Sequence, residues 1–145
     1  MSENYFTRAL EINEKNFGEN SLPASETLRR ISDTYEARGL YDQAEPYLLR
    51  AIKSAEISNG PDSDMAGINV WALCNFYDRW EKPDKSQPCW HRATGILEKT
   101  EGTSSPLLKN SLMAEANAWR KLGRNDEAQK LEERITNILK TAATQ

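Results

Sequence analysis

The sequence predicts an all-α protein built from repeated helix pairs, and two patterns lead to this prediction. An arginine recurs at a fixed interval of 42 residues, at Arg8, Arg50, Arg92 and Arg134. Between these arginines, apolar residues recur at alternating steps of three and four, which places them on one face of an α-helix. One helix pair alone presents too few apolar side chains to offset the entropy of ordering its residues. The pairs are therefore expected to stack on their neighbours as a solenoid.

The first predicted helix covers residues 3–17. Its apolar residues are expected to form a single stripe, made of Tyr5, Phe6, Ala9, Leu10 and Phe17. Gly18 follows and is expected to end the helix, because glycine readily adopts the left-handed conformation found after a helix C-terminus.

Three helix pairs follow, and we call the first helix of each pair the A helix and the second the B helix. The apolar positions of the A helices are Ala24, Leu28, Ile31 and Tyr35, then Ala66, Val70, Leu73 and Tyr77, then Leu108, Leu112, Ala116 and Trp119. Each B helix begins near an aspartate, at Asp42, Asp84 or Asp126, which we expect to cap the backbone N–H groups there. The first helix matches a B helix.

These elements give seven helices in four segments. The segments are a half repeat at residues 3–18, helix pairs at 22–59 and 63–101, and a more polar, cap-like pair at 105–141. We expect them to form one continuous domain.

The composition excludes several classes of function. The 145 residues are 38% hydrophobic and 28% charged with a net charge of −3, and there is no long basic run of the kind that binds nucleic acid or anionic lipid. No apolar run is long enough to cross a membrane, and no secretory signal is visible, so a cytoplasmic location is expected. Cys74 and Cys89 are too few for a disulfide framework or, with His91 as the only histidine, for a zinc site. Both are expected to be small buried side chains in a reducing compartment.

The best-formed pair resembles the tetratricopeptide repeat (TPR). Its B helix carries Gly-x-Tyr-x-x-Ala-x-x-x-Leu-x-x-Ala, with Gly39, Tyr41, Ala44, Leu48 and Ala51 in that frame. The longer period is similar to the extended repeats of kinesin light chains and their bacterial relatives. This resemblance covers residues 5 to about 140 and implies a right-handed α-solenoid.

The sequence departs from the TPR pattern in two places. In the second pair Glu81 and Pro83 replace the glycine and tyrosine of the turn, which predicts an altered turn between the helices. In the third pair polar residues stand at normally apolar positions, at Glu115, Asn125 and Glu132. These residues predict a polar cap that ends the stack.

The resemblance also implies a peptide-binding groove lined by the A helices. Carried over residue by residue, it selects Arg29, Asp33, Trp71, Asn75, Met113, Asn117 and Arg120. Trp71 and Met113 could supply apolar contacts, and Asn75 and Asn117 could bind a peptide backbone. The alternative is that Trp71 packs between neighbouring helices and the polar residues are only hydrated. The carboxylate clamp of chaperone-binding relatives is present only in fragments.

The leading interpretation is a non-enzymatic module that binds a peptide segment of a protein partner, with no cofactor and no metal. The alternative is a structural, self-assembling solenoid segment. In that case the first helix, which lacks an A helix, either belongs to a longer solenoid or forms a homodimer contact. No nucleophile, acid/base pair or glycine-rich phosphate loop supports catalysis.

Overall fold

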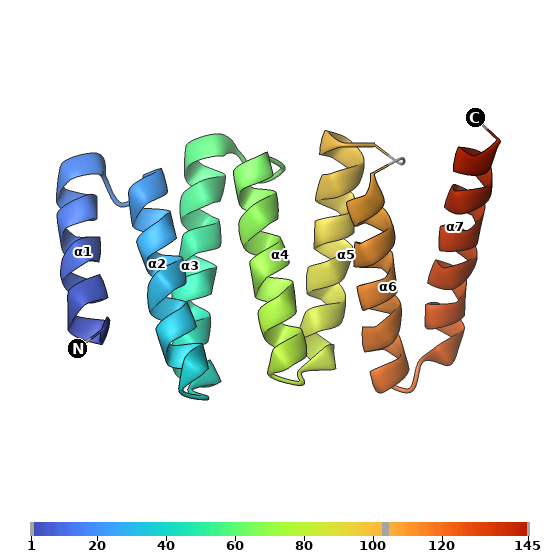
Figure 1. Cartoon of the computed structure of the whole chain (residues 1–145), viewed down its shortest axis with the longest axis horizontal. Helices are drawn as coiled ribbons and strands as arrows, with labels where there is room; N and C mark the ends of the chain where they lie inside the picture. The colour runs from blue at the N-terminus through green and yellow to red at the C-terminus, as the bar shows by residue number, and fades with distance from the viewer. Residues whose placement is uncertain (1, 103–104, 145) are drawn as a thin grey trace. The chain divides into compact units, whose positions relative to one another are not determined.

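The computed structural model describes residues 2–102 and 105–144, with side chains from residue 4 onward (Figure 1). Over these ranges the chain forms seven α-helices and no strand. The helices are α1 (Ser2–Phe17), α2 (Leu22–Ala37), α3 (Tyr41–Asn59), α4 (Asp64–Arg79), α5 (Pro83–Thr100), α6 (Pro106–Lys121) and α7 (Asn125–Ala143). The predicted all-α class and the seven helices are confirmed. In the terms defined above, α2, α4 and α6 are A helices, and α1, α3, α5 and α7 are B helices.

The chain divides into two compact units, Met1–Asn69 and Val70–Gln145. In the first unit α2 packs against both α1 and α3. Its core is a cluster of Leu10, Ala24, Leu28, Ile31 and Ala51, against which Phe6, Tyr35 and Tyr47 pack. The rings of Tyr35 and Tyr47 are stacked, with their centroids 5.6 Å apart.

The second unit contains the later part of α4 together with α5, α6 and α7, and α6 packs against both α5 and α7. Its core includes a cluster of Leu97, Leu108, Leu112 and Ile135, against which Trp71, Leu131 and Ile138 pack. The A-helix positions at steps of four and three thus form the core of each unit, as the periodicity predicts.

The turn between α4 and α5 has the same backbone geometry as the other two A-to-B turns. Gly39 and Gly123 have φ values of 74° and 78°, and Glu81 at the equivalent position has a φ of 58°. The N–H that follows each of them donates to the carbonyl of the aromatic residue near the end of the A helix, for example Lys82 to Tyr77 at 3.0 Å. The prediction of an altered turn is therefore wrong: Glu81 adopts the left-handed conformation itself.

The helix starts differ between A and B helices. The hydroxyls of Ser21 and Ser105 cap α2 and α6 by accepting backbone N–H groups. The B helices α3, α5 and α7 have no side-chain hydrogen bond from their N-cap residues, which are Leu40, Lys82 and Arg124. The aspartates predicted as caps lie inside the first turn instead, where they still favour the positive end of the helix dipole.

Ion pairs between B helices account for part of the arginine repeat. Arg50 of α3 pairs with Glu14 of α1 in the first unit, and Arg134 of α7 pairs with Glu98 of α5 in the second. Both pairs join residues 36 apart in the sequence. Glu14 and Glu98 therefore occupy equivalent positions in the 42-residue repeat, as Arg50 and Arg134 do.

Candidate peptide-binding site

The seven residues selected from the sequence fall in both units. Arg29 and Asp33 lie on α2 in the first unit. The other five lie in the second unit, with Trp71 and Asn75 on α4 and Met113, Asn117 and Arg120 on α6. The hypothesis that all seven line one groove stays a prediction.

In the first unit, Asp33 is exposed and Arg29 is half-buried. Asp33 lines an open hollow of about 510 Å³ whose other lining residues are Phe6, Arg30, Thr34, Ala37 and Arg38. Two arginines and one aspartate line this hollow, so it carries charges of both signs. Phe6 is its only large apolar side chain.

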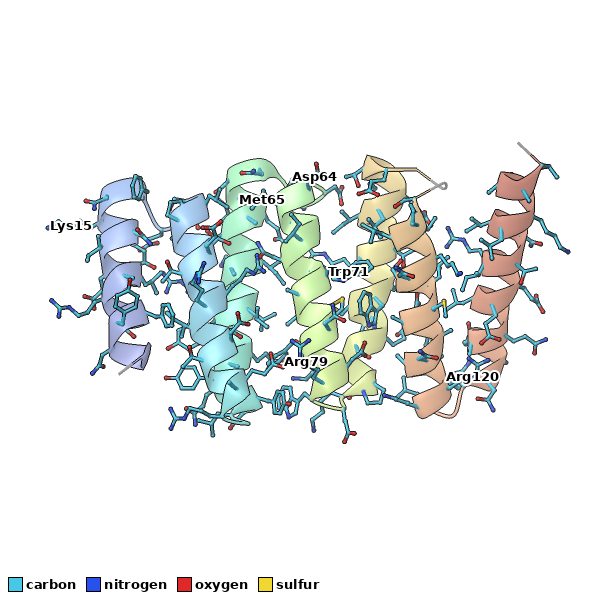
Figure 2. All side chains as sticks on the ribbon, in the orientation of Figure 1. Lys15, Asp64, Met65, Trp71, Arg79 and Arg120 are labelled. Atoms are coloured by element: carbon cyan, nitrogen blue, oxygen red, sulfur yellow. A yellow bond between two sulfur atoms is a disulfide. The ribbon has the colours of Figure 1, made fainter. Side chains whose placement is uncertain are left out.

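Trp71, labelled in Figure 2, lies on α4 and its side chain is half-buried. Its ring meets that of Trp90 edge-to-face, with centroids 4.8 Å apart and an interplanar angle of 89°. The Trp90 indole N–H donates to Asp78 Oδ2 at 2.9 Å, which fixes the ring against which Trp71 packs. Trp71 also packs against the cluster that contains Leu108 and Leu112 of α6. It is therefore held in place and still partly accessible.

Asn75 lies one turn after Trp71 on α4. Its side-chain Nδ2 donates to the Trp71 carbonyl at 3.3 Å, so one of the two N–H groups of this amide is engaged with its own helix. The second N–H and the amide oxygen are the groups of Asn75 that could bind the backbone of a ligand.

Met113 and Asn117 lie together at a hollow of about 280 Å³ formed by α6 and α7. Both side chains are exposed, Met113 to 46%. Ala116 and Ile135 also line this hollow, and Lys109, Glu132 and Thr136 add polar groups. Arg120 forms an ion pair with Glu132. The hollow thus offers a flexible thioether and an amide beside charged groups of both signs.

A buried carboxylate in the second unit was not selected from the sequence. Glu115 of α6 is only 3% exposed, and its Oε1 accepts a hydrogen bond from Gln87 Nε2 at 2.9 Å. His91 Nδ1 of α5 lies 3.2 Å from the same oxygen. Among the described residues Glu115 Oε2 has no hydrogen-bond partner. Glu115 is therefore part of the α5–α6 contact and not of a polar surface, which corrects that part of the cap interpretation; Asn125 and Glu132 are exposed as expected.

Cys74 and Cys89 form a disulfide that joins α4 to α5 next to the Trp71–Trp90 contact. Their Cα atoms are 5.3 Å apart, within the range for such a bond. Both side chains are buried as predicted, but the expectation that they are separate thiols is wrong. The 42-residue period could not reveal this pair, because the equivalent positions of the first pair are Ser32 and Tyr47.

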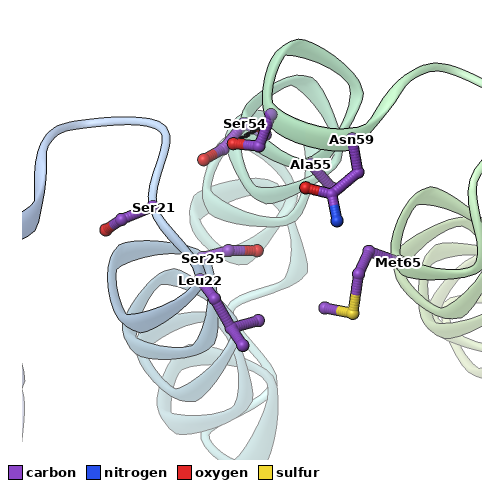
Figure 3. Close-up of a pocket in the computed structure, with 8 residues that line it drawn as sticks. Ser21, Leu22, Ser25, Ser54, Ala55, Asn59 and Met65 are labelled. Atoms are coloured by element: carbon purple, nitrogen blue, oxygen red, sulfur yellow. Dashed lines mark hydrogen bonds between the residues drawn. The ribbon is translucent and has the colours of Figure 1, made fainter.

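A narrow hollow in the first unit is lined by hydroxyls (Figure 3). Its volume is about 50 Å³, and its polar lining includes Ser21, Ser25, Ser54 and Ser58. Such a volume holds one or two water molecules and is too small for a peptide side chain of any size. Within the described part of the chain, no three histidine, cysteine or acidic side chains gather as possible metal ligands.

Antiparallel helix pairs that recur with one period define an α-helical repeat protein, a class that uses stacked helices to present binding surfaces. The family model described as "Tetratricopeptide repeat" matches residues 1–57. The first part of the chain therefore matches the tetratricopeptide-repeat family, as the sequence predicts.

Two solved structures show the same fold over nearly the whole chain. BtubC (BKLC) from P. vanneervenii has a TM-score of 0.80 and 19% sequence identity, and the match covers 97% of this chain. A Podosopora anserina protein described as a kinesin light chain with nearly identical TPR-like repeats has a TM-score of 0.80 and 16% identity, and the match covers 96% of this chain. The chain spans 56% and 66% of the lengths of these two proteins. No curated protein sequence matches it.

This fold supports a protein-interaction or scaffold module, and proteins that have it are generally not enzymes. Within the described ranges, the helices are too short or too polar for any of them to cross a bilayer.

Proposed function

We propose that the second unit binds a peptide segment of a protein partner along α4 and α6. The observation that carries this proposal is Trp71, which is fixed by Trp90 and by the apolar cluster of α6 and is still partly accessible. A rigid aromatic side chain that is already ordered loses little entropy on binding, and such residues dominate the binding energy of interfaces.

Met113 and Asn117 give the proposed site its second part. Methionine adapts to ligand side chains of different shapes. The amide groups of Asn117 and Asn75 would bind the peptide backbone, which every sequence offers. Lys109 and the paired Arg120 and Glu132 around the hollow would discriminate between charged peptides.

Selection from a displayed random-peptide library, followed by calorimetry with the best synthetic peptide, tests this proposal. We expect Met113→Ser to weaken binding by roughly tenfold, because loss of a central apolar contact at an interface costs more than about 1 kcal/mol. Leu107→Ser is the matched control, since Leu107 is also an exposed apolar residue of α6 and lies near its start.

Trp71→Phe keeps an aromatic ring against Trp90 and is expected to weaken binding while the fold remains intact. Circular dichroism of each variant checks the fold. A selected peptide that binds all three variants and the wild type equally would show that the site lies elsewhere.

A further inference from the structure

The Cys74–Cys89 disulfide lies next to the two indole rings of the proposed binding site. Cys74 comes three residues after Trp71 on α4, and Cys89 directly precedes Trp90 on α5. The disulfide is the yellow bond in Figure 2. The two cysteines are 15 residues apart, so the bond closes a short loop through the α4–α5 turn. The helices that carry Trp71 and Trp90 are therefore linked covalently beside their ring contact.

In the sequence, this helix pair alone combines the tryptophan with a cross-link. The positions that correspond to Trp71, Cys74 and Cys89 hold other residues, namely Arg29, Ser32 and Tyr47 in the first pair and Met113, Ala116 and Leu131 in the third. Those pairs fold without a disulfide, because the chain has two cysteines. Packing of the helix pair therefore does not require a bond at this place.

The α4–α5 contact also suits the reduced form of the two cysteines. Cys89 Sγ lies 3.5 Å from the backbone carbonyl oxygen of Val70, the residue before Trp71. A thiol at Cys89 can donate its hydrogen to this oxygen, whereas a disulfide sulfur carries no hydrogen. Cys74 is 0% exposed and Cys89 is 9% exposed, so a small reductant reaches Cys89 first. The same packing can therefore hold either the disulfide or two thiols.

We propose that the redox state of the Cys74–Cys89 pair controls how firmly Trp71 is held, and through it the peptide affinity of the second unit. This inference rests on the proposed function, because it concerns regulation of the same site. In the disulfide state α4 and α5 are cross-linked, and Trp71 is fixed against Trp90 before a ligand arrives. In the dithiol state the helices are joined by non-covalent contacts, such as the hydrogen bond from Trp90 to Asp78. Ordering of Trp71 then becomes part of the cost of binding.

Thiol–disulfide exchange with a dithiol interconverts the two states. One thiolate of the dithiol attacks Cys89 Sγ and forms a mixed disulfide, while Cys74 leaves as a thiolate and takes a proton. The second thiolate of the dithiol then attacks the mixed disulfide, releases Cys89 as a thiol and closes the reductant into a cyclic disulfide. Two electrons thus pass to the two cysteines, and a disulfide oxidant reverses the exchange.

Calorimetry of the full chain with the peptide selected from the library tests the inference, with the oxidised chain compared with the chain reduced by dithiothreitol. We expect the reduced chain to bind about two- to tenfold more weakly, which is the cost of ordering one side chain on binding. The double variant Cys74→Ser, Cys89→Ser is the matched control. It should bind like the reduced chain, with or without dithiothreitol.

NMR of the ¹⁵N-labelled indole N–H groups gives a second measurement, which needs no peptide and no variant. We expect the Trp71 and Trp90 resonances to shift when the disulfide is reduced. The Trp119 resonance is the internal control and should keep its position, because this ring lies near the end of α6, where it contacts Arg124. Well-dispersed indole signals also show that the reduced chain remains folded.

The outcomes distinguish this inference from the proposed function. If Met113→Ser and Trp71→Phe weaken peptide binding and reduction does not, the redox inference is wrong and the proposed function stands. If none of these changes weakens binding, both are wrong. A Trp71 resonance that does not move on reduction would also refute the inference, as would binding by the double serine variant that still depends on dithiothreitol.

Discussion

Glu81→Gly is expected to stabilise the protein. Glu81 is exposed and has a φ of 58°, in the left-handed region that Gly39 and Gly123 occupy in the equivalent turns. The Lys82 N–H that follows donates to the Tyr77 carbonyl at 3.0 Å, so φ of Glu81 cannot change to a negative value without breaking that bond.

The size of the effect follows from two opposing contributions. The left-handed conformation costs a residue with a Cβ about 1–2 kcal/mol, which glycine does not pay. Glycine in turn loses more unfolded-state entropy on folding, by about 0.5–1 kcal/mol. The net gain in the free energy of unfolding is about 0.5–1 kcal/mol, or roughly 1–4 °C in Tm for a chain of this size.

Thermal and urea unfolding followed by circular dichroism measure this gain. Gly39→Ala provides the reverse comparison and should lower the free energy of unfolding by a similar amount. A Cβ built on Gly39 meets no atom within 4 Å, so its cost is due to the backbone conformation alone. Glu81→Ala keeps the strained φ and is expected to stay within about 0.5 kcal/mol of the wild type, as exposed substitutions do.

A Glu81→Gly variant whose Tm equals or falls below that of the wild type would refute the reasoning. So would a Gly39→Ala variant that is as stable as the wild type. Either result would mean that the turn relaxes to a negative φ at little cost.

Three further predictions concern the core, the disulfide and the last helix. Leu112→Ala should lower the free energy of unfolding by about 2–5 kcal/mol, because it opens a cavity at a fully buried position, and urea unfolding measures this. Reduction of the Cys74–Cys89 disulfide should lower it by up to about 3 kcal/mol, as expected for a loop of 15 residues; a thiol assay on the denatured, unreduced chain should find no free thiol. The Arg124 side chain, by donating a hydrogen bond to the Asp126 carboxylate, lowers the pKa of that carboxyl. The contribution of the ionised Asp126 carboxylate to stability is therefore present above the unfolded-state pKa and is lost as pH falls through the folded-state pKa. Arg124→Gln should raise this pKa in an NMR titration, and an unchanged value would contradict the assignment.

The periodicity predicted the helices well because each helix depends on its own apolar stripe. The A-to-B turn at Glu81 could not be predicted from residue type. Packing of α4 and α5 outweighs the preference of this turn for glycine, which is only about 1 kcal/mol. The residue type at position 81 therefore did not predict the backbone conformation of the turn, because contacts between the helices determine it.

Contacts between helices explain the other differences. The Cys74–Cys89 disulfide and the Glu115–His91 contact depend on which residues meet across a helix pair, and neither recurs with the 42-residue period. For Trp71, the sequence left a packing role and a binding role open. The structure shows that it packs against Trp90, and its remaining exposure is what supports a binding role.

The spacing of the B-helix ion pairs has a consequence for how such a chain can change length. Each pair joins residues 36 apart, whereas the repeat itself is 42 residues long. A segment of 42 residues that starts before an arginine of the repeat and ends after the next glutamate therefore contains one arginine that pairs with the preceding segment and one glutamate that can pair with the following one. Tandem duplication of the segment Leu40–Glu81, which contains Arg50 and Glu56 in these two registers, would place a matching charge at each new junction. The gene could thus gain or lose whole repeats by recombination without leaving a like-charged junction between helices.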